Sequence, residues 1–471
     1  MKGLFIKSKS GNKYFYNDST GFIDPIVDGW SEEEFVKKYK KIIDSSAPVK
    51  KEQVTEEKLL KYLFDEAQGF KQLVLETTSS CNLRCKYCIY SDQYPTYKTY
   101  ENKYMSFDLA KKAVDLYLKN FKRVQYRNPS RTATIGFYGG EPLLNFKLIK
   151  QVVNYIKEEY TEKVSFNLTT NGLLFLGEVQ DFLAKNDFCI IVSLDGNEEN
   201  HDRNRVKING EGSFSEVMNN IGSFRKNHPD YGKFALSACY DLKSDLLEYE
   251  KFINDENLFL AKLALIEASN TTYYNQFTQN DIDKFNENNE ILGRKFYTAA
   301  KEGKVEKNSF LYSYIGLNYS QFAFHSVYNE KRPAILPYTG ACIPGEKLYV
   351  TIDGNIHMCE KINSNYPIGN ISDGLNYNEI INIINRYNDV VTRKCNECNV
   401  TRFCNLCYSQ CSTCSNEFNN SDNVCKNIET NTINTLVKYV NLLEIRPDLF
   451  EDVTVEYFGQ IYEKAGERIE L

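Results

Sequence analysis

The sequence predicts an α/β protein: a partial (β/α)6, TIM-like barrel, preceded by a small α+β module and followed by a Cys-rich domain. Three observations predict it. Strand and helix patterns alternate from about residue 71, short strand patterns precede them, and nine of the 14 cysteines lie between positions 342 and 425. The expected divisions are an N-terminal module at 1–70, a barrel core at 71–275, a helical linker at 276–339, a Cys-rich domain at 340–426 and a helical segment at 427–471.

Composition excludes several classes of protein. The chain has 57 Lys and Arg against 63 Asp and Glu, a net charge of −6, which argues against a globally basic nucleic-acid binder. No apolar run approaches the ~18–20 residues of a membrane span, and the N-terminus lacks an apolar signal core. The sequence therefore predicts a cytoplasmic protein with neither nucleic acid nor membrane as partner.

The first 70 residues predict a module of three short strands and two helices. Asn, Gly and Ser turns separate the strands, and Ser31 with Glu34 has the spacing of a helix capping box. Two interpretations stay open: an N-terminal extension without a role of its own, or a peptide-docking module with an exposed sheet edge. Strands are expected at 5–7, 13–16 and 21–23, helices at 31–43 and 56–66, and a linker at 45–51.

The alternating pattern that follows implies a mostly parallel sheet curled into a partial barrel. Loops that carry function should then lie at the C-terminal ends of the strands. A polar-faced helix is expected at 280–303, little regular structure from 340 onward, and a last helix at about 427–443. The six strands are expected at 72–77, 132–138, 164–169, 188–194, 234–240 and 258–266, and the helices at 108–121, 146–160, 177–185, 215–226 and 243–253.

Cysteine is the most informative residue type. Fourteen cysteines stand against four histidines, and clustered thiols in an intracellular chain more often bind metal than form disulfides. Thiolate-rich sites select zinc or iron–sulfur clusters. Cys81, Cys85 and Cys88 have the spacing Cys-x3-Cys-x2-Cys after the first barrel strand. Three such thiolates suit three irons of a four-iron cluster and leave the fourth iron open, whereas zinc would want a fourth ligand nearby.

This loop resembles the signature of radical S-adenosylmethionine (radical SAM) enzymes, with an aromatic Tyr87 before the third cysteine. The resemblance implies a 4Fe–4S cluster on Cys81, Cys85 and Cys88 whose open iron chelates S-adenosylmethionine. One electron, from a donor such as ferredoxin or flavodoxin, then cleaves this cofactor to a 5′-deoxyadenosyl radical, which abstracts a hydrogen atom from the substrate. Tyr87 would pack near the adenine.

Polar residues at the ends of the next three strands extend the resemblance over roughly residues 71–270. Two glycines let a ligand approach the backbone, and a carboxylate can receive an ammonium. Each polar residue has a structural alternative as a turn former or helix cap. By resemblance, Gly139, Gly140, Glu141 and Pro142 form an element that contacts the methionine amino group, Ser193 and Arg205 hold the methionine carboxylate, and Asn171 or Asp195 lies nearer the ribose.

The cysteines between 342 and 425 resemble a SPASM-type extension, which implies one or two auxiliary 4Fe–4S clusters, with two favoured. An Asp353-Gly354 hairpin should carry Cys359 back towards Cys342. The spacing departs from the family pattern after Cys404. By resemblance, Cys342, Cys359 and Cys407 hold the first auxiliary cluster and Cys395, Cys398, Cys404 and Cys425 the second, while the choice among Cys407, Cys411, Cys414 and Cys425 stays open.

Two further questions about these clusters stay open. A first auxiliary cluster with only three protein thiolates would leave one iron for a substrate cysteine, whereas four thiolates would saturate it. The Cys-x2-Cys pairs are also compatible with zinc sites.

The three-part layout resembles that of maturases of ribosomally made peptides. The resemblance implies that the N-terminal module binds the leader of a precursor peptide by adding a strand to its sheet, and that the core peptide reaches the radical. The expected product is a crosslink, with a Cys thioether favoured. Two alternatives are kept: an anaerobic sulfatase-type maturase that makes formylglycine, and a non-catalytic iron–sulfur electron carrier or zinc-binding scaffold.

No general base is assigned. Asp241 and Glu267 lie near predicted strand ends, where a solvated or structural role is favoured over proton transfer. His201 should be a structural hydrogen-bonding residue. Cys189 and Cys239 should be small, buried apolar side chains within strands.

Overall fold

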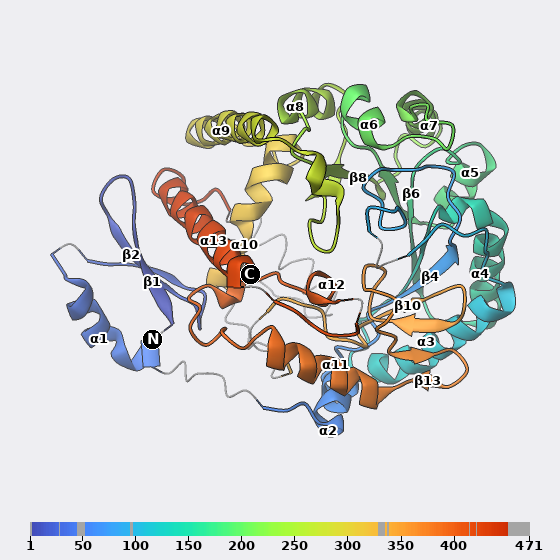
Figure 1. The fold of residues 1–471 in the computed structure, drawn as a ribbon, viewed down its shortest axis with the longest axis horizontal. Helices are drawn as coiled ribbons and strands as arrows, with labels where there is room; N and C mark the ends of the chain where they lie inside the picture. The colour runs from blue at the N-terminus through green and yellow to red at the C-terminus, as the bar shows by residue number, and fades with distance from the viewer. Residues whose placement is uncertain are drawn as a thin grey trace.

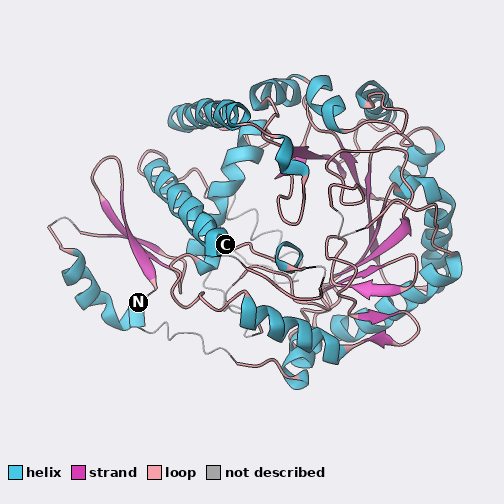
Figure 2. Ribbon diagram, viewed as in Figure 1, coloured by secondary structure: helices cyan, strands magenta, loops and turns pink. Residues whose placement is uncertain are grey.

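The computed structural model describes residues 2–450 apart from 28, 45–51, 95–97, 328–334, 337–338, 414 and 421. The predicted linker at 45–51, Cys414 and the end of the C-terminal segment after residue 450 lie outside these residues. The fold belongs to the predicted α/β class, and its larger sheet, on the right in Figure 2, is mostly parallel.

A ten-stranded sheet has the strand order β13-β12-β11-β10-β4-β5-β6-β7-β8-β9. Its strands β4 to β9 are parallel and adjacent in chain order, and helices lie along the outside of the curved sheet (Figure 1). All six predicted barrel strands are confirmed, whereas helix α6 was not predicted. The elements are β4 (Gln72–Thr78), α3 (Phe107–Arg127), β5 (Ala133–Gly139), α4 (Phe146–Glu159), β6 (Val164–Thr170), α5 (Glu178–Lys185), β7 (Cys189–Ser193), α6 (Glu198–Asn204), α7 (Phe214–Asn227), β8 (Phe234–Tyr240), α8 (Leu246–Asp255) and β9 (Leu260–Leu265).

The strand register separates an apolar outer face from a polar interior face. Directly paired residues project to the same side of a sheet. On the outer face, Leu168 pairs with Ile190, and both are fully buried. On the interior face, Ser193 pairs with Ser237, which in turn pairs with Lys262. The inside of the barrel therefore carries polar side chains at the ends of its strands.

The N-terminal module is an antiparallel three-stranded sheet in the order β1-β2-β3, followed by helix α1. The predicted capping box is present: Ser31 N donates to Glu34 Oε2 (2.7 Å) and Glu34 N to Ser31 Oγ (3.2 Å). The second predicted helix consists of α2 and a turn of π-helix. The bounds are β1 (Gly3–Lys7), β2 (Lys13–Asn17), β3 (Ile23–Pro25), α1 (Glu32–Asp44), α2 (Glu56–Leu60) and η1 (Lys61–Asp65).

This module packs against the Cys-rich region and lies beside α13 (Figure 1). The buried Asp18 carboxylate accepts hydrogen bonds from the Thr401 hydroxyl and from Arg402 N (2.9 Å). The rings of Tyr16 and Phe403 lie 5.3 Å apart. Residues after the second strand are therefore anchored to the loop between Cys398 and Cys404.

The C-terminal region contributes a strand to the barrel sheet. Strand β10 pairs in parallel with β4, and the predicted hairpin then turns at Gly354, which has a φ of +85°. The elements of this region are α9 (Gln279–Glu302), α10 (Leu317–Val327), β10 (Lys347–Val350), β11 (Asn355–His357), β12 (Gly369–Asn370), β13 (Gly374–Leu375), α11 (Tyr377–Val390), α12 (Tyr408–Cys411) and α13 (Asp422–Leu443).

The prediction of little regular structure from 340 onward is wrong at α11. Ile380, Ile383, Ile384 and Tyr387 follow the i, i+3, i+4, i+7 spacing of one helix face, and all four are fully buried. Asn376 caps the helix by accepting from Glu379 N (3.0 Å). Helix α10 was also not predicted, and α13 begins five residues before the expected start at 427.

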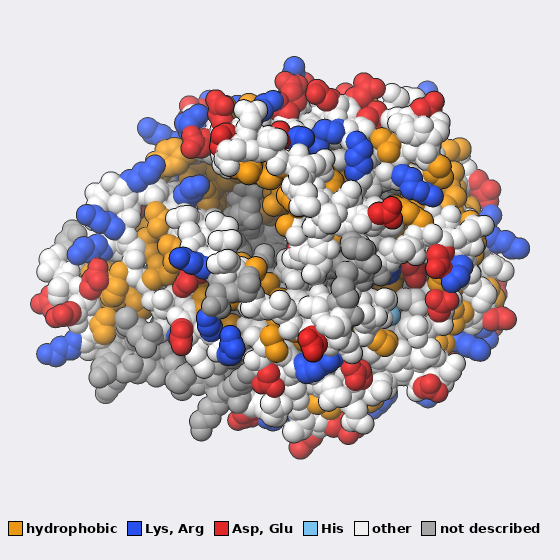
Figure 3. Space-filling view, viewed as in Figure 1, with side chains coloured by type: hydrophobic (Ala, Val, Ile, Leu, Met, Phe, Trp, Pro, Cys, Tyr) orange, Lys and Arg blue, Asp and Glu red, His pale blue; other side chains and the backbone are white. Residues whose placement is uncertain are grey.

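The distribution of charged side chains and the polarity of the helices both agree with the composition. On the face shown in Figure 3, basic and acidic side chains are intermixed. Within the part of the chain that the structure describes, each helix is too short or too polar to cross a membrane.

Candidate functional site

The cysteine loop, residues 79–91, follows β4 and is held by the segment that ends α6. Arg84 N donates to Val206 O (2.7 Å) and Lys86 N donates to Asn204 O (3.0 Å). Within the loop, Cys88 N donates to Cys85 O (3.0 Å). Backbone hydrogen bonds therefore fix the conformation of the loop, and Cys81 Sγ also accepts from Leu83 N (3.4 Å).

The three thiols of this loop lie within electrostatic range of one another. Burial, followed by the Glu141 carboxylate, raises the pKa of Cys81 to about 12, and Cys88 adds to the effect. Burial also raises the pKa of Cys85, and the nearby Cys88 and Cys81 add to the rise. Such thiols become thiolates when they bind metal, because metal replaces the proton. No group of three His, Cys, Asp or Glu side chains in the described ranges is arranged around a single metal ion.

Arg205 lies beside the cysteine loop and is bound to two of the predicted site residues. Its Nη1 donates to Tyr87 Oη (2.6 Å) and lies 3.9 Å from Asp195 Oδ2. Tyr87 donates its own hydroxyl proton to Asp195 Oδ2. Burial raises the pKa of Asp195, and the Arg205 charge opposes that shift. The structure thus brings Tyr87, Asp195 and Arg205 together, as a buried polar group next to the thiols.

One atom of this group is unpaired. Arg205 Nε is buried and has no hydrogen-bond partner among the described residues. A buried guanidinium N–H without an acceptor is costly, and a carboxylate is the acceptor that matches its geometry. The Arg205 charge also lowers the pKa of both Cys81 and Cys85, so Arg205 lies on the side of the loop where these thiols gather. The residues present therefore fit a ligand that carries a carboxylate next to the thiols, as the methionine part of S-adenosylmethionine does.

The two glycines of the predicted amino-group element lie against the end of β4 and the start of the cysteine loop. A Cβ on Gly139, whose φ is +135°, would lie 2.2 Å from Thr78 O, and one on Gly140 would lie 2.1 Å from Ser80 O. Gly140 N donates to Thr78 O (2.8 Å). Close contact between β5 and the start of the loop therefore requires glycine here, a reason that the sequence interpretation did not include.

Glu141 joins the ends of β5 and β6. Its carboxylate accepts from Leu143 N (3.0 Å), from Asn171 N (2.7 Å) and from the Thr170 hydroxyl (2.7 Å). Pro142 follows as the first residue of a short 3-10 turn, η2 (Pro142–Asn145). The Glu141 side chain is thus a helix cap and a strand connector in this structure, and its contact with a ligand stays a prediction.

The other two predicted cofactor residues also lie near the loop. Asn171 Nδ2 donates to Asn82 Oδ1 (2.7 Å), so this side chain contacts the residue next to Cys81. Ser193 is half-buried at the C-terminal end of β7, on the interior face of the barrel. Both positions are strand ends, as the sequence predicted.

The auxiliary cysteines separate into two neighbourhoods. Burial is the main cause of the raised pKa of Cys342 and Cys359, and Cys407 contributes to both shifts. In the second neighbourhood, burial raises the pKa of Cys395 to about 12, and the next contributions come from Cys404, Cys398 and Cys425. The assignment of these cysteines to one auxiliary cluster or the other stays a prediction.

Cys411 lies between the two neighbourhoods. It is buried, and its pKa is raised to about 12 by burial and then by Cys407, Cys425 and Cys404. Cys411 is therefore within reach of either site, which the spacing of the sequence could not show.

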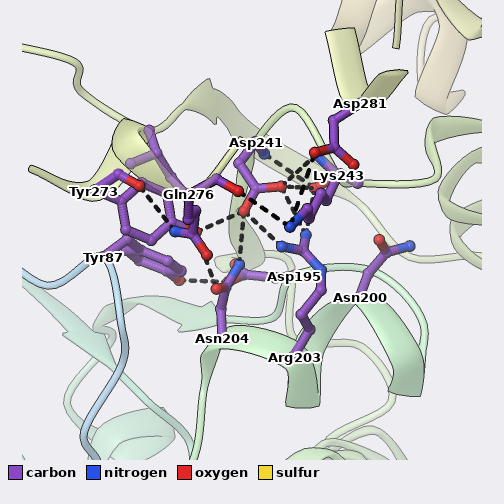
Figure 4. Close-up of polar contacts among 12 residues, drawn as sticks. Tyr87, Asp195, Asn200, Arg203, Asn204, Asp241, Lys243, Tyr273, Gln276 and Asp281 are labelled. Carbon is purple, nitrogen blue, oxygen red and sulfur yellow. Dashed lines mark hydrogen bonds and ion pairs between the residues drawn. The ribbon is translucent and has the colours of Figure 1, made fainter. Parts of the chain in front are cut away.

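A buried network around Asp241 accompanies the site (Figure 4). Arg203 donates to both carboxylate oxygens (2.7 and 2.8 Å), Tyr273 Oη donates to Oδ2 (2.6 Å) and Asn204 Nδ2 donates to the same oxygen (3.0 Å). Burial would raise the pKa of Asp241, but the hydrogen bonds and charge of Arg203 hold it below its usual value. With its oxygens engaged and fully buried, Asp241 has the structural role that the sequence favoured.

His201 and Glu267 also have structural contacts. The buried His201 accepts at Nδ1 from Asp195 N (3.2 Å), so its Nε2 carries the proton that is donated to Ser213 Oγ (3.0 Å). Glu267 is exposed and accepts from Gln410 Nε2 (3.0 Å). The prediction of a structural hydrogen-bonding role for His201 is confirmed.

The prediction for two isolated cysteines is wrong. Cys189 is exposed, because it begins β7 at the N-terminal rim of the barrel. Cys239 is half-buried on the interior face, where Asp195 Oδ1 accepts from its backbone N (2.9 Å). Both lie on the polar face of the sheet, and strand periodicity alone could not distinguish this face from the apolar one.

Residues 75–236 match the model of the Radical SAM superfamily. The chain therefore carries a radical SAM domain, and this match runs from within β4 to the start of β8 and includes the cysteine loop and Arg205.

The chain is also similar to named relatives. It is 29% identical over 167 residues to a cysteine-type anaerobic sulfatase-maturating enzyme of Clostridium novyi, across 35% of this chain and 42% of that enzyme. It is 24% identical over 229 residues to the radical SAM cyclopropyl synthase TigE of Paramaledivibacter caminithermalis, across 46% of each chain. The similarity thus spans less than half the length of these two relatives.

A solved structure with a similar fold is native anSMEcpe with bound AdoMet and Cp18Cys peptide. The TM-score is 0.55 at 19% identity, and the superposition covers 82% of this chain and 99% of that chain. This likeness concerns the fold.

Proposed function

We propose that the protein is a radical SAM enzyme that modifies a ribosomally made precursor peptide, with a Cys thioether crosslink as the favoured product. The observation that carries the cofactor half of the proposal is the unpaired Arg205 Nε beside the thiols of the cysteine loop. When bound, the 4Fe–4S cluster and S-adenosylmethionine supply a 5′-deoxyadenosyl radical that takes a hydrogen atom from the peptide. A second and a third cluster at the auxiliary cysteines complete the proposed set.

The chain's own residues would bind and orient the cofactor. Cys81, Cys85 and Cys88 hold the cluster, and Arg205 with Ser193 receives the methionine carboxylate. Tyr87 and Asp195 fix the guanidinium of Arg205 through the contacts described above, so that its remaining N–H groups face the ligand. The buried position of this group excludes water from the carboxylate contact and strengthens it.

The N-terminal module supports a peptide rather than a metabolite as substrate. The outer edge of β3 has no neighbouring strand among the described residues, and an extended peptide can add there as a fourth strand. Phe22 and Val27 flank this strand with exposed fractions of 40% and 60%, which offers apolar contacts to such a peptide. The leader of the precursor would bind at this edge.

Loss of one cysteine of the loop tests the cofactor half. Cys81→Ala should abolish formation of 5′-deoxyadenosine from S-adenosylmethionine and dithionite under anaerobic conditions. Cys189→Ala is the matched control, because that thiol is exposed at the far rim of the barrel. Undiminished turnover in Cys81→Ala would overturn the proposal, and so would an absence of 5′-deoxyadenosine from the wild type, which the electron-carrier and zinc-scaffold alternatives predict.

A charge at the β3 edge tests the substrate half. The probe is the peptide encoded by a short Cys-containing reading frame beside the gene. Phe22→Asp should weaken its binding in a fluorescence titration by roughly tenfold, since a buried charge at an interface is costly. Tyr126→Asp, at an 83% exposed position on α3, should leave binding unchanged. Equal affinity of both variants would place the leader elsewhere.

The product distinguishes the thioether enzyme from the sulfatase-type maturase, which the relative in Clostridium novyi keeps as the second candidate. A thioether crosslink lowers the peptide mass by two hydrogen atoms and retains sulfur. Formylglycine made from cysteine loses the sulfur and yields an aldehyde that reacts with hydrazines. Mass spectrometry of the incubated peptide separates the two outcomes.

A further inference from the structure

A cavity of about 580 Å³, here called the α9–α13 cavity, is lined by helices α9, α10 and α13. Its lining includes Tyr240, the last residue of β8, at the end of the barrel that carries the candidate functional site. It also includes Phe403, whose ring lies 5.3 Å from that of Tyr16 in the N-terminal module. The cavity therefore connects the barrel with the module that is proposed to bind the leader.

Helix α13 belongs to both the cavity and the module, and Figure 1 shows it between the module and α10. Asn431, Thr435 and Lys438 line the cavity, and their i, i+4, i+7 spacing places them on one face of the helix. Leu436 and Val440 lie on another face and belong to the apolar cluster that includes residues of the module. One helix thus separates the two sites without leaving a gap in the chain between them.

The chemistry of the lining suits an uncharged peptide. Among the described residues that line the cavity, Lys438 is the only one with a charged side chain at neutral pH. Carboxamide side chains come from all three helices, and aromatic rings such as those of Tyr314 and Phe322 add apolar surface. A carboxamide donates and accepts hydrogen bonds with the same groups as a backbone amide. An extended peptide can therefore bind here through its backbone.

Some of these carboxamides are held by the protein and others are available. Asn289 Oδ1 accepts from the Tyr314 hydroxyl, and Asn318 Nδ2 donates to Tyr314 O (2.8 Å). Asn286 on α9 and Asn431 on α13 are exposed, and neither side chain forms a hydrogen bond with the described part of the chain. Walls formed by two different helices thus offer donors and acceptors to a ligand.

We propose that the α9–α13 cavity binds the segment of the precursor peptide that joins the leader to the modified residue. The proposal rests on the proposed peptide-modifying function and adds a property of the substrate: this segment is extended and uncharged, and it binds mainly through its backbone. Because the cavity adjoins the module, a leader bound at β3 raises the effective concentration of this segment at the cavity. The peptide is then held at the end of the barrel where the radical forms.

Filling the cavity tests the proposal. Gly293 lines it from within α9, and a Cβ added there would meet no atom within 4 Å, so the backbone accommodates Gly293→Phe while the ring occupies the cavity. The probes, in fluorescence titrations of the intact protein, are the peptide encoded by the short Cys-containing reading frame beside the gene and the N-terminal half of that peptide, which contains the leader. Gly293→Phe should weaken binding of the whole peptide by roughly tenfold and leave the N-terminal half unaffected.

The matched control is Gly222→Phe on α7, where an added Cβ also meets no atom within 4 Å and which lies outside the cavity. It should change neither affinity. Unchanged binding of the whole peptide to Gly293→Phe would overturn the proposal. Weaker binding of both probes to Gly293→Phe alone would also overturn it, because the leader itself would then occupy the cavity. Charged residues throughout the segment before the first cysteine of the peptide would contradict its uncharged character.

An alanine pair on α13 tests the backbone contacts. Asn431→Ala should weaken binding of the whole peptide roughly three- to tenfold, the value of a lost hydrogen bond. Asn434→Ala changes an exposed asparagine of the same helix that does not line the cavity, and it should leave the affinity unchanged. Equal affinities of these two variants would contradict binding through the carboxamides.

Formation of 5′-deoxyadenosine by the wild type separates the two levels of the argument. A wild type that forms none contradicts the proposed function. A wild type that forms it, together with full affinity of Gly293→Phe for the whole peptide, contradicts only the role of the cavity.

Discussion

Arg205 shows how a single side chain can link the thiols, the aromatic residue and the acid of the site. Its charge partly offsets the rise in the pKa of Asp195 that burial causes. Its buried Nε–H has no hydrogen-bond acceptor among the described residues. Arg205→Met should therefore weaken the binding of S-adenosylmethionine by roughly 10–100-fold, the value of a lost hydrogen bond to a charged group. Equilibrium dialysis on the reconstituted protein measures the change.

Two further variants make the Arg205 test decisive. Arg127→Met removes an exposed arginine on α3 and should leave the affinity unchanged. Arg205→Lys retains a charge next to Asp195 and guards against misfolding of the methionine variant. Wild-type affinity in Arg205→Met would show that the carboxylate of the cofactor binds elsewhere.

His201 predicts how stability depends on pH. Burial, with a smaller contribution from Arg205, holds its pKa well below the usual value. Below about pH 6.5 the unfolded chain binds a proton that the folded chain does not. The free energy of unfolding is therefore unaffected by His201 above that pH and decreases as the pH falls below it. The loss has a limiting slope of ~1.4 kcal/mol per pH unit.

Urea unfolding of the wild type and His201→Gln at about pH 7.5 and 5.5 tests this linkage. The glutamine variant should lose less stability between the two pH values than the wild type, whatever its stability at the higher pH. An equal loss in both proteins would assign the acid sensitivity to other groups.

At the scale of elements, local sequence signals predicted most of the barrel and missed helix α11, which is rich in asparagine. The six barrel strands were found because apolar runs are bounded by turn residues, and the Ser31–Glu34 box located α1. Helix α11 was missed although its isoleucines have helical spacing, because asparagines between them resemble loop composition. Composition is a weaker signal than periodicity in such a chain.

The candidate site was predictable to the extent that it depends on strand ends. Tyr87, Asp195 and Arg205 were singled out from their motifs and do meet in the structure. The position of Cys411 close to Cys404, Cys407 and Cys425 depends on how the C-terminal segments fold together. No local pattern encodes such contacts.

The close contact between the end of β5 and the backbone at the end of β4 yields a prediction. Alanine at Gly139 would combine a φ of +135° with a Cβ 2.2 Å from Thr78 O. Gly139→Ala should therefore displace the loop, lower the iron bound per chain after reconstitution and destabilise the fold by ~1–3 kcal/mol. Gly222→Ala is the control, because no atom lies within 4 Å of the added Cβ in α7. Equal iron content in the two variants would contradict the steric role of Gly139.

For the whole molecule, metal should stabilise the Cys-rich region more than the barrel. Between residues 392 and 413 the regular structure is limited to a 3-10 turn and the one-turn helix α12. Metal binding supplies folding free energy where apolar packing is limited. Removal of iron with a chelator under anaerobic conditions should therefore expose this segment to proteases first, while the barrel stays intact.

Limited proteolysis with mass mapping, compared between iron-loaded and iron-free protein, measures this difference. Simultaneous cleavage in the barrel and in the segment from 392 to 420, at equal rates with and without iron, would show that the metal does not stabilise the region selectively.

The pairing of β10 with β4 affects how the chain must be made and handled. Strand β4 is synthesised long before residues 347–350. One edge of the sheet therefore has unpaired backbone amide and carbonyl groups during most of synthesis. A shortened protein that stops at residue 275 would leave the edge of β4 unpaired and would tend to self-associate through it. The intact polypeptide is therefore the unit to express, and a barrel-only fragment is a poor substitute for it.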